Sequence, residues 1–126
     1  MHNAIPLSVA VLVSFGIILI GCFYLISPQR VSGSFGLKPP APDGDTRAWL
    51  RLKGIRDIAS GLAVLTLMLT TDSRTVGLLL LVFALIPLGD MSNILVSAGR
   101  KAIAFSVHGV TCAVMLLAGL LLVHSL

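Results

Sequence analysis

The chain contains no glutamate, and its five acidic residues are all aspartates. Charged residues of either sign make up only 11% of the 126 residues, whereas a soluble domain carries about 25%. Hydrophobic residues account for 56% of the chain. This composition excludes an ordinary soluble domain. We therefore predict an integral membrane protein whose main partner is the lipid bilayer.

Cysteine is equally scarce. Cys22 and Cys112 both fall within apolar segments, and two isolated thiols make neither a disulfide framework nor a metal site. The formal net charge is +4, but no basic stripe lies on a soluble face, so we expect no nucleic-acid partner. The positive charge instead matches the loops that set the orientation of a membrane protein. The sequence indicates no metal, and the cofactor stays unknown.

What the sequence does contain is a set of four long apolar segments. About 20 apolar residues suffice to cross the hydrocarbon core of a bilayer, so each segment can form a transmembrane helix. Pro6 suits a helix start, Asp45-Thr46 offers an N-cap, and Asp72 or Ser73 offers another. We predict a single domain, 1–126, with helices over residues 6–26, 46–69, 75–98 and 101–124.

Two irregular features interrupt this pattern. Pro87 removes the hydrogen bond to the Phe83 carbonyl inside the third helix, so we expect a kink there. Residues 27–45 form the only long loop, because proline and glycine recur through most of it. A loop of this length can be a functional lid or a flexible connection, and the sequence leaves both open.

Loop charge predicts the orientation. The side of the membrane that holds the long loop carries most of the basic residues, and the opposite side holds Arg74 and the chain ends. The positive-inside rule therefore puts loop 27–45 in the cytoplasm and both termini on the non-cytoplasmic side. The predicted fold is an all-α, up-down-up-down four-helix bundle. We expect it to be a multi-pass protein of the bacterial inner membrane.

Charged residues of three predicted helices converge at one depth. Arg56 and Asp57 lie seven and eight residues beyond Trp49, near the start of the second helix. Asp90 lies about eight residues before the end of the third helix, and His108 lies seven residues beyond Lys101 in the fourth. At about 1.5 Å of rise per residue, all four side chains start roughly 10–12 Å from the cytoplasmic face. This shared layer is the strongest functional signal in the sequence.

The cost of burying charge predicts pairing within this layer. An unpaired charge at the centre of a transmembrane helix costs about 2.5–3.5 kcal/mol, so we expect Arg56 to pair with Asp90 or Asp57. Lys53 and Asp57 form an i, i+4 pair, and Asn93 shares a stripe with Asp90. The alternative is that the layer only holds the helices together, as interhelical polar contacts commonly do.

Four short motifs carry a family resemblance. They are Phe35-Gly36-Leu37, Gly54-Ile55-Arg56-Asp57, Gly89-Asp90 and His108. In these motifs the chain resembles a widespread family of small four-helix membrane proteins catalogued as a domain of unknown function (DUF4267 type). The resemblance covers nearly the whole chain and implies a four-helix integral membrane fold with no established activity. DoxX-like proteins are similar in size and helix count.

The residues favour a polar pocket, open toward the cytoplasm, that binds or transforms a small, partly apolar molecule. The sequence leaves open whether the protein is an enzyme. As a hypothesis, Asp90 and His108 are the catalytic acid–base pair. The expected ligand-binding residues are Arg56, Asp57, Asn93 and Lys53. Two alternatives stay open: a proton-coupled small-molecule transporter acting as a homodimer, and a structural membrane subunit.

Overall fold

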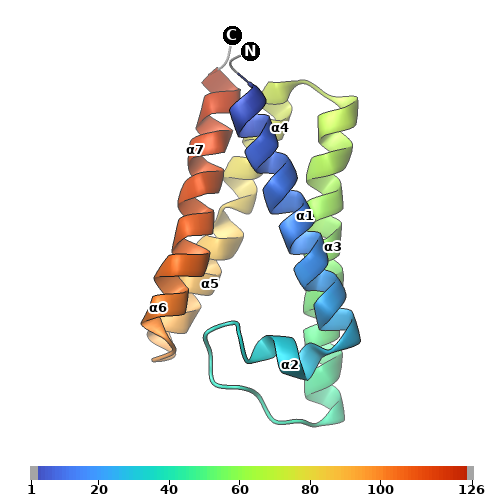
Figure 1. Ribbon diagram of the computed structural model, residues 1–126, viewed down its shortest axis with the longest axis vertical. Coiled ribbons are helices and arrows are strands. Elements are labelled where there is room, and N and C mark those ends of the chain that lie inside the picture. The colour runs from blue at the N-terminus through green and yellow to red at the C-terminus, as the bar shows by residue number, and fades with distance from the viewer. Residues whose placement is uncertain (1–2, 125–126) are drawn as a thin grey trace.

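The computed structural model describes residues 3–124 and confirms that the chain is all-α. Its helices are α1 (Ala4–Ile26), α2 (Pro28–Ser32), α3 (Gly44–Thr70), α4 (Ser73–Phe83), α5 (Leu85–Val96), α6 (Lys101–Ile103), the π-helical turn η1 (Ala104–Gly109) and α7 (Val110–His124). Residues 3–124 include no strand. The start of α1 and the end of α7 lie at one end of the molecule, and α2 with the loop after it lies at the other (Figure 1).

Two aspartates are the N-caps of the helices that follow them. The Asp43 carboxylate accepts hydrogen bonds from the Thr46 N–H at 2.7 Å and the Thr46 hydroxyl at 2.9 Å. The Asp72 carboxylate receives the same pair of bonds from Thr75 at 3.0 and 2.9 Å. These bonds, led by the backbone N–H, lower the pKa of both carboxyls. The Asp72 cap was predicted, whereas the N-cap predicted at Asp45-Thr46 is wrong: Asp43 caps α3, which begins at Gly44.

The kink predicted from Pro87 is confirmed as a break between α4 and α5 at Ala84. Pro87 has no N–H to donate to Phe83, and helical bonding resumes with the Leu88 N–H, which lies 3.2 Å from the Ala84 carbonyl. A second irregularity was not predicted. The segment expected as one helix over 101–124 contains η1, a turn of wider backbone winding in its first half.

Glycines bring the helices into backbone contact in pairs. A Cβ on Gly54 of α3 would lie 2.7 Å from the Gly21 carbonyl oxygen of α1, and a Cβ on Gly21 would lie 2.6 Å from the Gly54 carbonyl oxygen. Gly77 of α4 and Gly119 of α7 approach in the same way, at 2.8 and 3.0 Å. Only glycine permits this approach, so α1 pairs tightly with α3 and α4 pairs tightly with α7.

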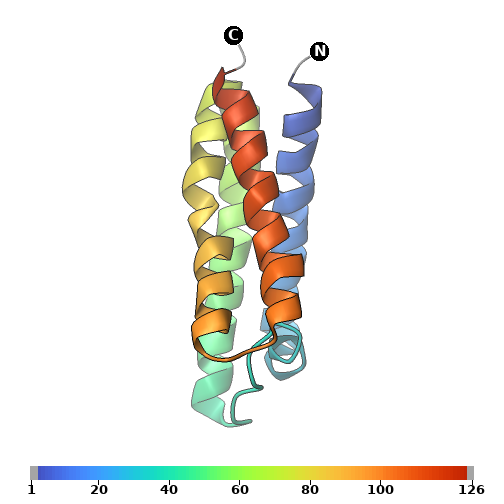
Figure 2. The same ribbon diagram turned by 90° about the vertical axis from the view of Figure 1, so that its left-hand side faces the viewer.

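The apolar core occupies the half of the molecule near the chain ends. It is formed by side chains of α1, α3, α4 and α7 together with Ala84: Ala10, Val64, Val76, Leu80, Ala84, Cys112, Met115, Ala118 and Leu122. Toward the opposite end, α5 and η1 lie away from α3 (Figure 1). Figure 2 shows the loop after α2 passing beneath this second half. The fold is therefore packed at one end and closed by a loop at the other.

The loop that follows α2 is anchored to the helices. The backbone N–H of Arg100 donates to the Gly36 carbonyl at 2.8 Å, and the Arg100 guanidinium donates to the Gly33 carbonyl at 2.8 Å. The Gln29 side-chain amide donates to the Pro40 carbonyl at 3.1 Å. Gly36 adopts a φ of +110°, which side chains rarely allow. The loop therefore folds over the helix ends as an ordered segment.

Three helical segments are long and apolar enough to cross a membrane among the residues that the structure describes: Ala4–Ile26, Ser73–Val96 and Lys101–His124. Large apolar side chains on their outer faces are exposed, including Leu12 (71%) and Leu117 (62%). Apolar exposure on this scale is a liability in water and is expected against lipid.

Candidate functional site: a cavity with a polar end

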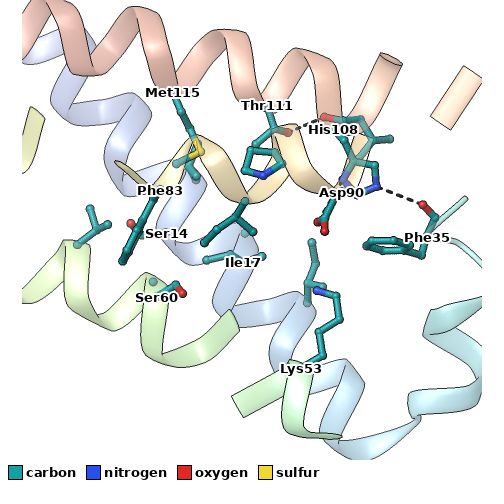
Figure 3. A pocket seen from close by; sticks show the side chains of 18 of the residues that line it. Ser14, Ile17, Phe35, Lys53, Ser60, Phe83, Asp90, His108, Thr111 and Met115 are labelled. Atoms are coloured by element: carbon teal, nitrogen blue, oxygen red, sulfur yellow. Dashed lines mark hydrogen bonds and ion pairs between the residues drawn. The ribbon is translucent and has the colours of Figure 1, made fainter. Parts of the chain in front are cut away.

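A cavity of about 320 Å³ lies between the paired helices and above the loop after α2. Its walls are apolar along most of its length and include Val13, Ile17, Ile20, Phe83, Ile86 and Met115. Its ionisable side chains, Lys53, Asp90 and His108, gather at the end nearest the loop (Figure 3). A volume of about 300–1,000 Å³ is typical of small-molecule sites, so the cavity is large enough to hold a ligand.

His108 links the polar end to the loop. Its Nε2 lies 3.2 Å from the Phe35 carbonyl oxygen, and its Nδ1 lies 3.6 Å from Oδ2 of Asp90. The Phe35 ring packs edge-on against the imidazole, with ring centroids 4.8 Å apart. The π-helical turn η1 carries His108, and α5 carries Asp90 just beyond the break at Ala84. Both irregular stretches of backbone therefore contribute to the polar end of the cavity.

The contacts of His108 fix where its proton lies. A carbonyl oxygen only accepts hydrogen bonds, so Nε2 must be the N–H donor to Phe35. In the neutral ring, Nδ1 then presents a lone pair toward the Asp90 carboxylate, which is itself an acceptor. Within residues 3–124, Asp90 makes an ion-pair contact with His108 and interacts electrostatically with the Lys53 ammonium. At a separation of 3.6 Å no donor fits between Nδ1 and Oδ2, so a ligand donor would have to approach them from the cavity, which both residues line.

Lys53 forms the opposite side of the polar end. Its ammonium donates to Oδ2 of Asp57 at 2.7 Å, as the i, i+4 spacing predicted. The same ammonium lies 5.0 Å from the centre of the Tyr24 ring and 5.5 Å from that of Phe35. Both rings present their negative faces to the cation, which stabilises it away from water. Lys53 is therefore held in place by one carboxylate and two aromatic rings.

The structure separates the predicted site residues into two groups. Lys53, Asp90 and His108 line the cavity, and Asp57 is buried behind Lys53 without lining it. Arg56 and Asn93 are exposed and do not line it. The expected pairing of Arg56 with Asp90 or Asp57 is wrong, because Asp57 points inward and Arg56, one residue earlier, is turned outward by about 100°. Lys53 takes the place that Arg56 was expected to fill.

Three lining residues were not predicted as site residues. Phe35 and Tyr24 sandwich the polar end, and Ser14 lies further along the cavity. The Ser14 hydroxyl is buried and has no hydrogen-bond partner. A signal for two of them was present, because Tyr24 is the only tyrosine of the chain and Ser14 is a polar residue inside an apolar run. Phe35 belongs to the Phe35-Gly36-Leu37 motif of the family resemblance, but its contact with His108 arises only when the loop folds over the helices.

The residues that the structure describes contain no group of three or more histidine, cysteine or acidic residues that could hold a metal ion. The polar end combines one lysine, one aspartate and one histidine around a space open to the cavity. Such a set can exchange a proton with a bound molecule and can hold a neutral polar group. It is poorly suited to a hard divalent cation, which prefers several oxygen ligands.

These features define a class: a small all-α protein with helices able to cross a membrane and a cavity that is polar at one end. The chain belongs to the family described as a domain of unknown function (DUF4267), whose model matches residues 14–122. The resemblance predicted from the sequence is thereby confirmed. The matched region contains every residue that lines the cavity apart from Val13. Searches of curated proteins and of solved structures found no match to the chain.

Proposed function

We propose that the protein is an integral membrane four-helix bundle that binds or transforms a small, partly apolar molecule in this cavity. The observation that supports the proposal is that Asp90 and His108, whose Oδ2 and Nδ1 atoms lie 3.6 Å apart, both line one end of an apolar cavity. A ligand hydroxyl or amide N–H would donate to one of them, while the apolar walls would bury the rest of the molecule.

The proposal includes α3 as the fourth span. This helix has 27 residues, which exceeds the length that a bilayer requires. Its charged side chains occur in its first half, where Asp57 and Lys53 pair inward and Arg56 is exposed. An exposed arginine two turns into a span can extend its side chain to the headgroups, and Trp49 suits the interface. In this topology the polar end of the cavity lies toward the cytoplasm.

The same residues would perform chemistry if the bound molecule reacts. His108 keeps its Nε2 proton on the Phe35 carbonyl, so its Nδ1 is the atom that can take a proton from a ligand or return one. Asp90 would stabilise the resulting imidazolium from 3.6 Å. Lys53 would hold a ligand oxygen that gains negative charge. The same proton exchange would serve a transporter.

Binding of a medium-chain primary alcohol tests this function. The protein is purified in detergent, and the alcohol is titrated while bound copies are counted by native mass spectrometry. Thr111 lines the cavity, so Thr111→Phe should obstruct it and abolish saturable binding. Val114 lies on the same helix, is 37% exposed and does not line the cavity, so Val114→Phe is the matched control and should bind as the wild type does.

The two substitutions separate a ligand site from other roles. If both variants bind the alcohol like the wild type, the cavity is not the binding site and the proposed function fails. If the wild type binds none, the polar layer serves only to hold helices together, as in a structural subunit. Asp90→Asn combined with His108→Ala should weaken binding about tenfold or more, the range expected for loss of one hydrogen bond to a charged group.

A further inference from the structure

We propose that the ligand of this cavity is a neutral, elongated molecule with a hydroxyl at one end and a second polar group at the other. This inference rests on the proposed function and specifies its ligand class. The hydroxyl would donate to Asp90 or to His108. The second polar group would bond the hydroxyl of Ser14, and the molecule between them would be apolar.

Ser14 differs from the two other serine and threonine residues of the helices that line the cavity. Ser60 and Thr111, which also line the cavity, donate to the carbonyl oxygen four residues earlier at 2.8 and 2.7 Å. The Ser14 side chain makes no such bond, although it is 1% exposed and its oxygen is buried. A buried hydroxyl without a partner is rare, because removing it from water is costly unless a hydrogen bond replaces the lost one.

The position of Ser14 sets the length of the ligand. Ser14 precedes Tyr24, which contacts Lys53, by ten residues on α1, or about 15 Å of helix rise. On α3, Gly61 packs against the Ser14 carbonyl, and it follows Lys53 by eight residues, or about 12 Å. The wall between these levels consists mainly of apolar side chains such as Ile17, Ile20 and Ile86. A molecule of roughly 10–15 Å would therefore reach both polar groups.

The charges at the polar end favour a hydroxyl over a carboxylate. Lys53 is already paired with Asp57 at 2.7 Å. A carboxylate on the ligand would face the Asp90 carboxylate and would add a repulsion in a site of low dielectric constant. A hydroxyl avoids this cost, since it donates to Asp90 or His108 and can accept a bond from Lys53.

A comparison of two probes tests the inference: a medium-chain α,ω-diol of this length and the primary alcohol of the same chain length. Native mass spectrometry gives the ratio of their affinities for each variant. The wild type should prefer the diol about three- to tenfold, the value of one net hydrogen bond. Ser14→Ala should bring the ratio to about one while leaving the affinity for the monoalcohol unchanged. Equal affinity of the wild type for both probes would overturn the inference.

Ser60→Ala is the matched control. Ser60 also lines the cavity, but its hydroxyl is already bonded to the Arg56 carbonyl, so the variant should keep the preference for the diol. If Ser14→Ala keeps that preference as well, Ser14 is not the second contact and the inference is wrong. Suppose that the wild type binds the monoalcohol without a preference for the diol and that Thr111→Phe abolishes this binding. The proposed function then holds, but the second contact does not. A wild type that binds neither probe refutes both.

Discussion

The ion pair of Lys53 and Asp57 should contribute unequally to stability: removing Lys53 should lower the free energy of unfolding more than removing Asp57. The Asp57 side chain is 8% exposed, whereas that of Lys53 is 30% exposed, and their charged atoms lie 2.7 Å apart. Lys53→Met leaves a buried carboxylate without a partner. Asp57→Leu leaves an ammonium on a flexible stem, which can extend toward the headgroup region and water.

The magnitudes follow from this difference. Breaking a buried pair by removing one partner costs about 3–5 kcal/mol. We place Lys53→Met at the lower end, at about 3 kcal/mol, because the lysine is partly exposed and its own burial cost is recovered. Asp57→Leu should cost about 1 kcal/mol, the scale of a weakly buried pair. The double variant should resemble Asp57→Leu, because replacing both charges with apolar groups of similar volume is often nearly neutral.

Unfolding by sodium dodecyl sulfate in mixed micelles measures the four free energies, with helix content followed by circular dichroism. The coupling energy from the double-mutant cycle should be about 2 kcal/mol or more. The reasoning is refuted if Lys53→Met costs no more than Asp57→Leu. It is equally refuted if the double variant is as unstable as Lys53→Met, since the carboxylate would then not be the source of the cost.

Two further predictions concern packing and helix capping. Gly54→Ala places a methyl group 2.7 Å from the Gly21 carbonyl oxygen, so it should cost about 1–3 kcal/mol of stability by overpacking. As a control, the methyl group of Gly16→Ala meets nothing within 4 Å, so this variant should be neutral or slightly stabilising. Equal effects of the two variants in the micelle assay would contradict the close approach. Thr75 lowers the pKa of the Asp72 carboxyl below its ordinary 3.8, so the cap stabilises the helix above about pH 4 and is lost as the pH falls through the folded pKa. The melting temperature of Asp72→Ala should therefore lie below that of the wild type at pH 7, and the gap should close in acid; a gap that persists at pH 2 would contradict this.

The helical segments were predictable because an apolar run removed from water follows a simple rule. An apolar run must close all its backbone hydrogen bonds within itself, so long apolar segments become helices. The break before Pro87 followed from the missing N–H of that residue. Helix ends depended on local competition between neighbouring caps. Asp43 and Asp45 flank the first residue of α3, and nothing in their spacing alone indicates that Asp43 forms the cap.

The sequence predicted how deep the charged residues of the site lie along their helices, but not which way their side chains point. Counting residues from the helix ends places Arg56, Asp57, Asp90 and His108 in one layer, and the structure brings Asp90 and His108 together. Which side chain faces inward depends on the rotation of each helix. The buried positions of α3 are Gly54, Asp57, Gly61 and Val64, which recur at helical spacing and exclude Arg56. The two glycines of that stripe were the available signal, because they mark where α3 meets α1.

The π-helical turn had no sequence signal, yet it changes which residues of the last helix face the cavity. A wider turn shifts every later side chain relative to a regular helix, so the face assigned by 3.6-residue periodicity does not carry through 104–109. Gly109 lies within this turn, where a Cβ would come 3.1 Å from the sulfur of Met91 on α5. The turn thus packs against α5, and its orientation is set by a tertiary contact.

The cavity follows from how the helices are joined. Glycine contacts hold α1 against α3 and α4 against α7, and the break at Ala84 and the turn η1 both lie on the second pair, bordering the cavity. Irregular backbone at membrane depth persists where protein buries it or where it lines a cavity. If the polar residues served only to hold helices together, regular helices would bring their charges into direct contact. Instead, the irregular backbone leaves Asp90 and His108 3.6 Å apart beside an open space, which favours a binding site over a structural contact.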